Sequence, residues 1–551
     1  MSRLASRRDF LQAAAAGMAA LAAGRVFAAD AGVKRPGIAS NLVLNDDGHC
    51  FLVINDDLTP ADLRRYLGSY CREGVGAVAY CVGDMTWPTL YPTQVGVHYT
   101  KVRDGAAFKL TRFYRNVDRF AAEPGGYFGE VFRTIHGFGK KVLASFRMND
   151  AHFTSKTNTH VSEFWKQHAE LSLGSAYGYY GGCLNYASEV VRDHFKARVE
   201  EFVKLYPEID GIELDGMRSP FFFPPGTGPQ HALLFTRMVR EIKAILQAEA
   251  RQRSRPEYLL SINVPLTPEV ALECGLDVAA WDEERLFDWI SAGTYQAIMK
   301  HPMEQWKKTL KHGTPVFAYI GCSPQTGQYL GLEEYRAAAA NTYGSGGDGV
   351  YLFNYPCLFE LTSQIPRPLK ETGDELADLR RWGHPDLTKV GQSLDEMSSA
   401  ALLRKKDKRF LFYWSNDTRY RHYDPDIASL DRAQPDAAVA AVFRCYENGA
   451  EAKERMIRFK LENVARSEQF EVSLNGRPVD PGRRSIRYAP NGRDTRIHTV
   501  KIGPYQQYDL SLGSEELLRG ENVLEIKPIK LLPGIIEKVN LIELEVMIRY
   551  G

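Results

Sequence analysis

Short, nearly continuous apolar runs alternate with amphipathic stretches over the first two thirds of the chain, and this alternation constrains the fold most. The runs are rich in Val, Ile, Leu, Tyr and Phe, as is typical of parallel strands buried on both faces. They lie at residues 50–55, 76–82, 141–147, 211–215, 258–264, 287–292, 315–321 and 349–354. Helical patterns separate them, at residues 60–73, 127–139, 190–206, 229–251, 302–312 and 332–343.

Repeated strand–helix units of this kind predict an α/β fold, a closed (β/α)8 TIM barrel with loop insertions. The alternative is an open, doubly wound sheet, but no Gly-x-Gly-x-x-Gly follows an early strand. After about residue 385 the pattern changes to short strands and turns, at 409–414, 439–445, 455–461, 470–474, 498–502, 508–512, 522–526 and 542–550. This pattern predicts a C-terminal antiparallel β-sandwich, in which Asn475-Gly476 forms a hairpin turn. We therefore expect a barrel over 30–385 and a sandwich over 386–551.

The N-terminal segment is typical of a twin-arginine signal peptide over residues 1–29. Arg7-Arg8 precede Phe10-Leu11, an Ala-rich stretch and small residues that suit a cleavage site. We therefore expect export to the periplasm or secretion. No later segment reaches the roughly 18 apolar residues of a membrane helix, so no membrane insertion is expected after signal removal.

Charge and cysteine content narrow the possible partners. The formal net charge is +1, which provides no basic field for nucleic acid. The eight cysteines include no Cys-x-x-Cys pair, so a cysteine zinc site is not expected. Several lie inside apolar runs, where buried free thiols are the commoner state.

The run at 211–215 carries two carboxylates at the end where barrel active sites lie. Glu213 and Asp215 share one face, and the strand rise roots their side chains roughly 6.5–7 Å apart. Such a pair suits cleavage of a glycosidic bond, with one group protonated and the other ionised. Alternatively, Glu213 pairs with Arg147 or Arg218 and only orders the barrel.

Other run ends add polar and aromatic side chains. Arg147 follows an apolar strand, where an arginine is costly unless it meets carboxylates or substrate. We predict that the catalytic residues are Asp215, Glu213 and Asp150. Asn and Tyr side chains at a barrel mouth suit hydroxyl-rich ligands. The predicted substrate contacts are Arg147, Asn149, His152, Arg218, Asn263, Tyr295, Asn354, Tyr355 and Trp87.

Residues from about 140 to 300 resemble the glycosyl-hydrolase-like family-10 group of exported bacterial barrels. The matching blocks are Ser145 to His152, Glu163-Phe164-Trp165 with His168, Asp210 to Arg218, Gly275 to Trp281 and Phe287 to Ile290. The resemblance implies glycan hydrolysis at Asp150, Glu213 and Asp215, without fixing one linkage or sugar. In the C-terminal part, the segments 473–476 and 520–526 resemble jelly-roll accessory domains of carbohydrate enzymes, a common feature.

The chain departs from the better-known retaining barrels, which place a glutamate nucleophile on the seventh strand. The run at 317–321 offers no carboxylate, so the partner of Asp215 must come from elsewhere. Besides Glu213, the possible partners are Asp150, Asp84, Asp282 and Glu360. Whether the reaction retains or inverts configuration depends on a carboxyl separation that the sequence does not supply.

Two other functions are open. One is a non-catalytic glycan-binding protein on a degenerate barrel. The other, less favoured, is a metal-dependent hydrolase that uses Asp150 with His136, His152, His160 and His168, although no His-Glu-x-x-His is present. We expect a carbohydrate substrate, no organic cofactor and no catalytic metal, and leave the oligomeric state open.

Overall fold

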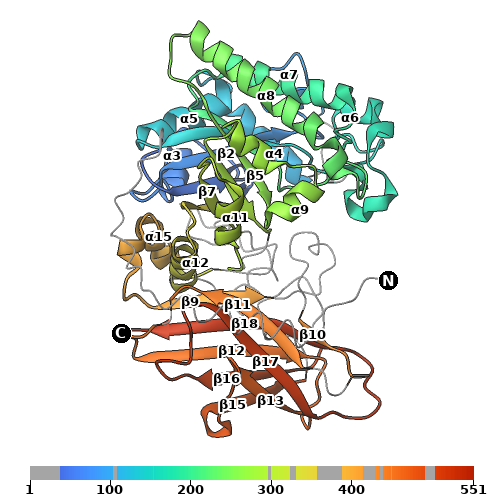
Figure 1. Cartoon of the computed structure of the whole chain (residues 1–551). Helices are drawn as coiled ribbons and strands as arrows, with labels where there is room; N and C mark the ends of the chain where they lie inside the picture. The colour runs from blue at the N-terminus through green and yellow to red at the C-terminus, as the bar shows by residue number, and fades with distance from the viewer. Residues whose placement is uncertain are drawn as a thin grey trace. The chain divides into compact units, whose positions relative to one another are not determined.

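Eight parallel strands close into a barrel in sequence order, which confirms the predicted (β/α)8 fold (Figure 1). The strands are β1 (Leu42–Asp46), β2 (Ala77–Asp84), β3 (Lys141–Arg147), β4 (Gly211–Asp215), β5 (Leu259–Pro265), β6 (Trp289–Gly293), β7 (Val316–Gly321) and β8 (Gly349–Phe353). This computed structural model describes residues 38–102, 108–152, 154–295, 299–322, 330–356, 387–413, 428–434, 438–447, 449–490 and 503–551. The predicted signal peptide lies outside them.

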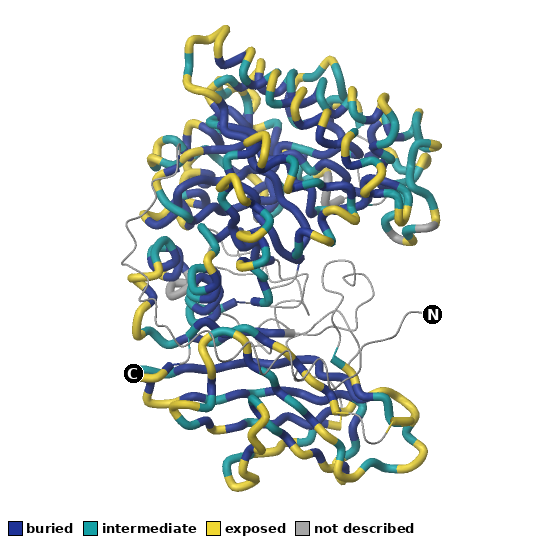
Figure 2. The backbone as a smooth tube through the Cα atoms, in the orientation of Figure 1, coloured by how far each residue is buried: buried dark blue, intermediate teal, exposed yellow. Residues whose placement is uncertain are grey.

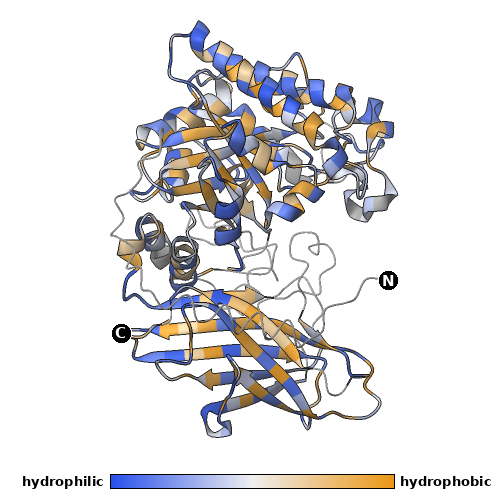
Figure 3. Cartoon of the chain, in the orientation of Figure 1, coloured by the Kyte–Doolittle hydropathy of each residue, from blue (hydrophilic) through white to orange (hydrophobic). Residues whose placement is uncertain are grey.

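Helices follow the strands and bury one face each against the barrel. They include α3 (Pro60–Gly68), α4 (Phe108–Asp118), α5 (Gly126–Gly137), α7 (Glu189–Leu205), α8 (Gly228–Gln252), α10 (Val278–Glu283), α11 (Met303–Thr309) and α12 (Leu332–Gly344). Val191, Phe195, Val199 and Phe202 form the buried stripe of α7, at the spacing expected for one helix face. Figure 2 shows the inner part of the barrel mostly as buried backbone, and Figure 3 shows apolar and polar residues alternating along α8.

The first strand differs from the prediction, which placed it at 50–55. The observed β1 is Leu42–Asp46, and Cys50–Ile54 forms the short helix α2. Between them, Gly48 adopts a φ of 77°, and a side chain there would collide with the carbonyl oxygen of Cys81. This turn lets the chain leave the barrel. A five-residue apolar run does not distinguish a buried strand from a buried helix by periodicity, which explains the error.

Inward-facing residues of the barrel change from apolar to polar along β2 to β5. A distinct apolar cluster includes Val43, Ala77, Leu143, Leu259, Trp289 and Phe317. Nearer the C-terminal ends, Ser145, Glu213 and Ser261 stand in register on β3, β4 and β5. The last row holds Asp84, Arg147, Asp215 and Asn263. The polar rows therefore lead to the end where barrel enzymes hold their active sites.

Two antiparallel sheets form the C-terminal part, as predicted. One has the order β10-β18-β12-β16-β15 with β9 beside β18, and the other has the order β11-β17-β13-β14. Their strands are β9 (Lys408–Tyr413), β10 (Ser429–Leu430), β11 (Val439–Cys445), β12 (Glu454–Glu462), β13 (Gln469–Leu474), β14 (Arg477–Pro478), β15 (Arg484–Ala489), β16 (Tyr505–Ser511), β17 (Gly520–Lys530) and β18 (Val539–Arg549). Asn475 and Gly476 join β13 to β14 with φ values of 53° and 75°, which confirms the predicted hairpin.

Three further expectations concern the C-terminal part of the chain. The predicted strand at 498–502 lies outside the described residues. The strand β15 was not predicted, because most of its side chains are polar and half of them are exposed. Helix α15 (Leu387–Glu396) follows the predicted boundary at 385, yet its Asp395 pairs with Arg72, in the segment after α3. The domain boundary itself stays a prediction.

The described cysteines are all free, and all but Cys274 are buried. Among the described residues, no helix has the length and apolar character needed to cross a bilayer.

Candidate active site

Four polar side chains stand in register at the C-terminal ends of neighbouring strands. Asp84 ends β2, Arg147 ends β3, Asp215 ends β4, and Asn263 lies near the end of β5. The two aspartates and the asparagine are buried, whereas the Arg147 side chain keeps 12% exposure. Residues from four strands thus form one wall of the barrel mouth.

Asp150 is the centre of an ion-pair network above this wall. One of its carboxylate oxygens accepts from Arg147 Nη1 at 3.3 Å and from Arg218 Nε at 3.1 Å. The other oxygen contacts the ring and the backbone N–H of His152. Burial alone would raise the pKa of Asp150, but Arg218, His152 and Arg147 together hold it well below its usual range. Asp150 is therefore ionised and fixed, and it orients both arginines, while Asp47 binds the far side of Arg147.

Glu213 lies one row deeper and is fully buried. Its Oε1 accepts from the hydroxyl groups of Ser145 at 2.7 Å and Tyr351 at 2.8 Å, whereas its Oε2 has no hydrogen-bond partner among the described residues. Burial, and next the charge of Asp215, raise the pKa of Glu213 to about 8. Glu213 therefore carries a proton at neutral pH.

Asp215 has one fixed and one open carboxylate oxygen. Its Oδ1 accepts from the backbone N–H groups of Met217 and Arg218, each at 3.1 Å. Its Oδ2 is buried without a hydrogen-bond partner in the described part of the chain. Burial raises the pKa of Asp215, and Arg147 opposes this rise. An oriented carboxylate with an open acceptor atom calls for a ligand or an ordered water.

Asp84 faces the same space from β2. Its Oδ1 accepts from Thr86 N at 2.5 Å, Thr86 Oγ1 at 2.9 Å and Trp87 N at 2.8 Å. Burial, and then the charge of Asp150, raise its pKa to about 7. Asp84 was only one of several partners proposed for Asp215 from the sequence. The sequence feature that pointed to Asp84 as a site residue was its position at the end of a buried strand.

The sequence also suggested Asp282 and Glu360 as partners of Asp215. Asp282, on α10, accepts from His312 N at 2.7 Å and Thr314 N at 2.9 Å, and it thereby fixes the segment before β7. Glu360 lies outside the described residues.

Most of the predicted substrate contacts lie at the strand ends. The Arg218 guanidinium packs over the Tyr295 ring at 5.2 Å from its centroid. Asn263 donates to Tyr351 at 3.0 Å and leaves its own Oδ1 without a partner among the described residues. Asn354 adopts a left-handed φ of 52° after β8, and Trp87 is half-buried with its backbone N–H bound to Asp84. Arg218 binds Asp150, and Asn263 stands in register with Asp215.

Two of the predicted contacts, Asn149 and Tyr355, make contacts inside the fold. The Asn149 amide nitrogen donates to the carbonyl groups of Leu184 at 2.8 Å and Phe221 at 2.6 Å, and its oxygen accepts from Leu184 N at 2.7 Å. This side chain therefore joins two loops. Tyr355 is buried beside the rings of Tyr70 and Tyr335. The prediction extended strand alternation beyond β3 and β8, whose regular pairing ends earlier.

The four histidines proposed as metal ligands do not share one place. His136 pairs with Asp210 just before β4, at the opposite end of that strand from the site, whereas His152 binds Asp150. Among the described residues, one group has donor atoms close enough for a metal ion: Asp47, His49 and Cys50. Asp47 already binds the Arg147 guanidinium, whose positive charge opposes a metal cation there.

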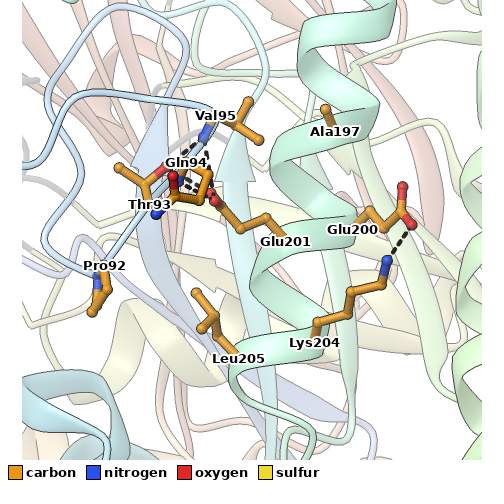
Figure 4. A pocket seen from close by; sticks show the side chains of 9 residues that line it. All are labelled: Pro92, Thr93, Gln94, Val95, Ala197, Glu200, Glu201, Lys204 and Leu205. Atoms are coloured by element: carbon orange, nitrogen blue, oxygen red, sulfur yellow. Dashed lines mark hydrogen bonds and ion pairs between the residues drawn. The ribbon is translucent and has the colours of Figure 1, made fainter.

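A hollow of about 450 Å³ lies away from these strand ends, between residues 92–95 and α7 (Figure 4). Glu201 points from α7 toward the turn, where its carboxylate accepts from Thr93 Oγ1 at 2.7 Å and Val95 N at 3.2 Å. On the same helix, Lys204 pairs with Glu200. Glu201 therefore holds the long loop after β2 against the barrel.

Comparisons with known proteins find similar folds at low similarity. No protein-family model and no curated protein matches the chain, so the resemblance to the family-10 group stays a prediction. A solved structure described as a glycoside hydrolase is 10% identical, with 89% of this chain and 92% of that chain covered and a TM-score of 0.34. A glycoside hydrolase family 5 protein from Bacteroides vulgatus is 10% identical, with 89% of each chain covered and a TM-score of 0.35. A class V chitinase from Pseudomonas fluorescens is 11% identical, with 62% of this chain and 99% of that chain covered and a TM-score of 0.31. Similarity at this level does not indicate an activity. The assignment of the barrel fold comes from the observed pairing of its strands.

Proposed function

We propose that this protein is a glycoside hydrolase that cleaves an oligo- or polysaccharide at the C-terminal mouth of its barrel. The observation that carries the proposal is a pair of buried carboxyl groups, Asp84 and Asp215, in surroundings that suit different tasks. Burial and Asp150 raise the pKa of Asp84 to about 7. Asp215 instead presents an open oxygen beside Arg147, which opposes the rise in its pKa. Glycosidic cleavage needs one carboxyl group of each kind.

Asp84 is assigned as the general acid. With a pKa of about 7, about half of these carboxyl groups are protonated at neutral pH, where transfer to the glycosidic oxygen is favourable. Asp215 is assigned as the base or nucleophile. Two backbone N–H groups fix its Oδ1, so its Oδ2 is free to activate water or attack the anomeric carbon. The strands β2 and β4 flank β3, so the two backbones lie roughly 10 Å apart and the carboxyl groups can approach a sugar from two sides.

Glu213 and Asp150 take supporting roles in this proposal, although the sequence suggested both as catalytic. Glu213 is too deep to reach a glycosidic bond, and its neutral form avoids a second negative charge beneath Asp215. Asp150 is held by Arg147 and Arg218 and is too acidic to donate a proton. Both groups set the electrostatic environment of Asp215.

A carbohydrate ligand fits the side chains around these carboxyl groups. Tyr295 and Trp87 provide aromatic surface, while Asn263 and Asn354 have open amide oxygens at the described strand ends. Export through the twin-arginine pathway, to the periplasm or outside the cell, is also proposed, on the basis of Arg7-Arg8 and the Ala-rich stretch.

Two variants test the assignment on a broad glycan panel and on aryl glycosides with good leaving groups. Asp215→Asn should lower kcat by at least about 100-fold on every substrate. Asp84→Asn should lower kcat by roughly 100- to 10,000-fold on glycans but much less on activated aryl glycosides, which need no proton donor. The exposed Glu163 on α6 (Glu163–Gln167) supplies a control, Glu163→Gln, with unchanged rates.

Full activity of Asp215→Asn would overturn the assignment of this residue. A wild-type protein that binds glycans but cleaves none of the panel would support the non-catalytic alternative.

A further inference from the structure

A buried arginine lies behind Asp84, on the helix side of the barrel wall. Arg198 belongs to α7 and is 2% exposed. Its Nη1 donates to the backbone carbonyl oxygen of Asp84, and the Tyr91 hydroxyl lies beside the guanidinium, whose Nε and Nη2 make no hydrogen bond of good geometry among the described residues. A buried cation without a paired carboxylate costs several kcal/mol, so its presence calls for a reason.

The strand that Arg198 contacts contains a β-bulge. Cys81 pairs with Ser145, but Gly83 pairs with the next residue, Phe146, so Val82 is an extra residue in β2. In a regular strand Gly83 would stand opposite Arg147 and face the barrel interior. The bulge shifts this alternation by one residue and brings Asp84 opposite Arg147 instead.

The guanidinium of Arg198 occupies the outer side of this bulge. Gly83 has a φ of 149°, and a Cβ placed on it would lie 3.3 Å from Arg198 Nη2. The cation thus packs where a side chain would stand and binds the carbonyl group of the following residue. The bulge and Arg198 therefore act together to direct the Asp84 carboxyl group into the barrel mouth.

We propose that Arg198 is a positioning residue for Asp84, holding the bulge through the Asp84 carbonyl group and placing a fixed positive charge behind the carboxyl group. This inference rests on the proposed function, in which Asp84 is the general acid. It assigns a role to a helix residue that does not reach the substrate.

Several groups around Asp84 act on its carboxyl group, and Arg198 is one of them. Burial and Asp150 raise the pKa of Asp84, whereas Thr86 and Arg198 lower it. Cys81 and Tyr114 also face Asp84, but burial raises the pKa of both, so they are neutral. Arg147 stands opposite on β3.

On the helix side, the neighbours of Arg198 are His194, Tyr91 and Tyr186, which carry no charge at neutral pH, and Glu201 lies one turn further along α7, where the turn at residues 92–95 binds its carboxylate. Burial and Arg198 lower the pKa of His194 to about 3. Burial also raises the pKa of the Tyr91 and Tyr186 hydroxyl groups. Arg198 is therefore the positive charge that acts on Asp84 from this side of the described structure, with the Glu201 carboxylate one turn further along α7.

The test compares pH profiles of wild type, Arg198→Gln and Arg198→Lys on an active glycan. Loss of the charge should raise the pKa of Asp84, so the alkaline limb of kcat/KM should move to higher pH. It should also lower kcat with little change in KM, because the substrate does not touch Arg198. Arg198→Lys keeps the charge and should bring the limb back toward the wild-type position. A merely structural role would lower the rate at every pH and leave the limb in place.

A second measurement does not depend on activity. In protein labelled with ¹³C-aspartate, the carboxyl signal that disappears in Asp84→Asn belongs to Asp84, and its titration should move to higher pH in Arg198→Gln. If the Gln variant does not fold, Arg198→Met fills the same buried space without a charge and replaces it.

The outcomes separate the two proposals. An unmoved limb and an unmoved Asp84 titration in a folded Arg198 variant would overturn the positioning role, even where Asp84→Asn is inactive. Full activity of Asp84→Asn would overturn the general-acid assignment, while a shifted Asp84 titration in Arg198→Gln would still support the contact.

Discussion

Replacing Glu213 by Gln should make the protein more stable than wild type at alkaline pH but not at acidic pH. The glutamine keeps an oxygen that can accept from Ser145 and Tyr351, so the packing of the site is preserved. It cannot ionise. The wild-type carboxyl group, by contrast, must either stay protonated in the fold or carry a charge where it is fully buried.

The size of the effect follows from proton linkage. The folded protein raises the pKa of Glu213 from 4.5 to about 8, because burial and Asp215 disfavour its charged form. Below pH 4.5 the group is protonated in both states and has no effect. Between 4.5 and about 8 only the unfolded chain releases the proton, so wild-type stability falls by about 1.4 kcal/mol per pH unit and by about 5 kcal/mol in total.

Chemical denaturation of wild type and Glu213→Gln from pH 5 to pH 8 measures this difference. The two free energies of unfolding should diverge steadily as the pH rises, with the variant more stable. The exposed Glu163→Gln variant should follow the wild-type curve instead. Parallel curves for wild type and Glu213→Gln would refute the conclusion that Glu213 is protonated in the fold.

Three further predictions concern the surroundings of the site. Asn149→Ala should lower the free energy of unfolding by about 2–4 kcal/mol, because three buried backbone groups lose their partner. The KM of the variant should stay nearly constant. An unchanged denaturation curve would contradict this prediction. Asp150→Asn should cost about 3–5 kcal/mol at pH 7, since Arg147 and Arg218 lose a shared carboxylate. The pKa of Asp150 is lowered from 3.8, so its contribution is present above that pH and is lost on further acidification; melts at pH 7 and pH 3 should therefore differ less in the variant. Thiol titration of the unfolded, unreduced chain should detect at least the seven free cysteines of the described residues, and a lower count would indicate disulfides.

The sequence predicted the barrel strands well where both faces are buried and the flanking helices are long. The bounds of β3 and β4 agree with the predicted runs residue by residue. The prediction of the first strand was wrong because two apolar segments lie within a few residues of each other, and either could form that strand. They are Leu42–Asp46 and Cys50–Ile54. Only the turn at Gly48 and packing against the barrel decide between them, and neither is a local property.

The candidate site was predictable only as far as regular strand alternation extends. Glu213, Asp215 and Arg147 face inward, as the period of two requires. Asp84 faces inward because of an extra residue in β2, and the local signal for that bulge, the isolated Gly83 within the strand, was not used in the prediction. Beyond the ends of β3 and β8, Asn149 and Tyr355 follow loop geometry, which the periodicity does not describe.

The two sides of the barrel interior differ in a way that connects the fold to the proposed chemistry. Phe317 on β7 and Phe353 on β8 belong to the apolar cluster that also lines the deeper part of the barrel. On β5 and β6, Ser261 and Ser291 are buried with hydroxyl groups that lack a partner among the described residues. Each such group costs about 1–3 kcal/mol unless an ordered water satisfies it. Ser261 stands beside Glu213 on the neighbouring strand. A polar side chain therefore lies next to the carboxyl groups, in a position where an apolar side chain would pack. A barrel built only for stability would fill this space with branched apolar side chains, so the polar side is best explained by the chemistry at its mouth.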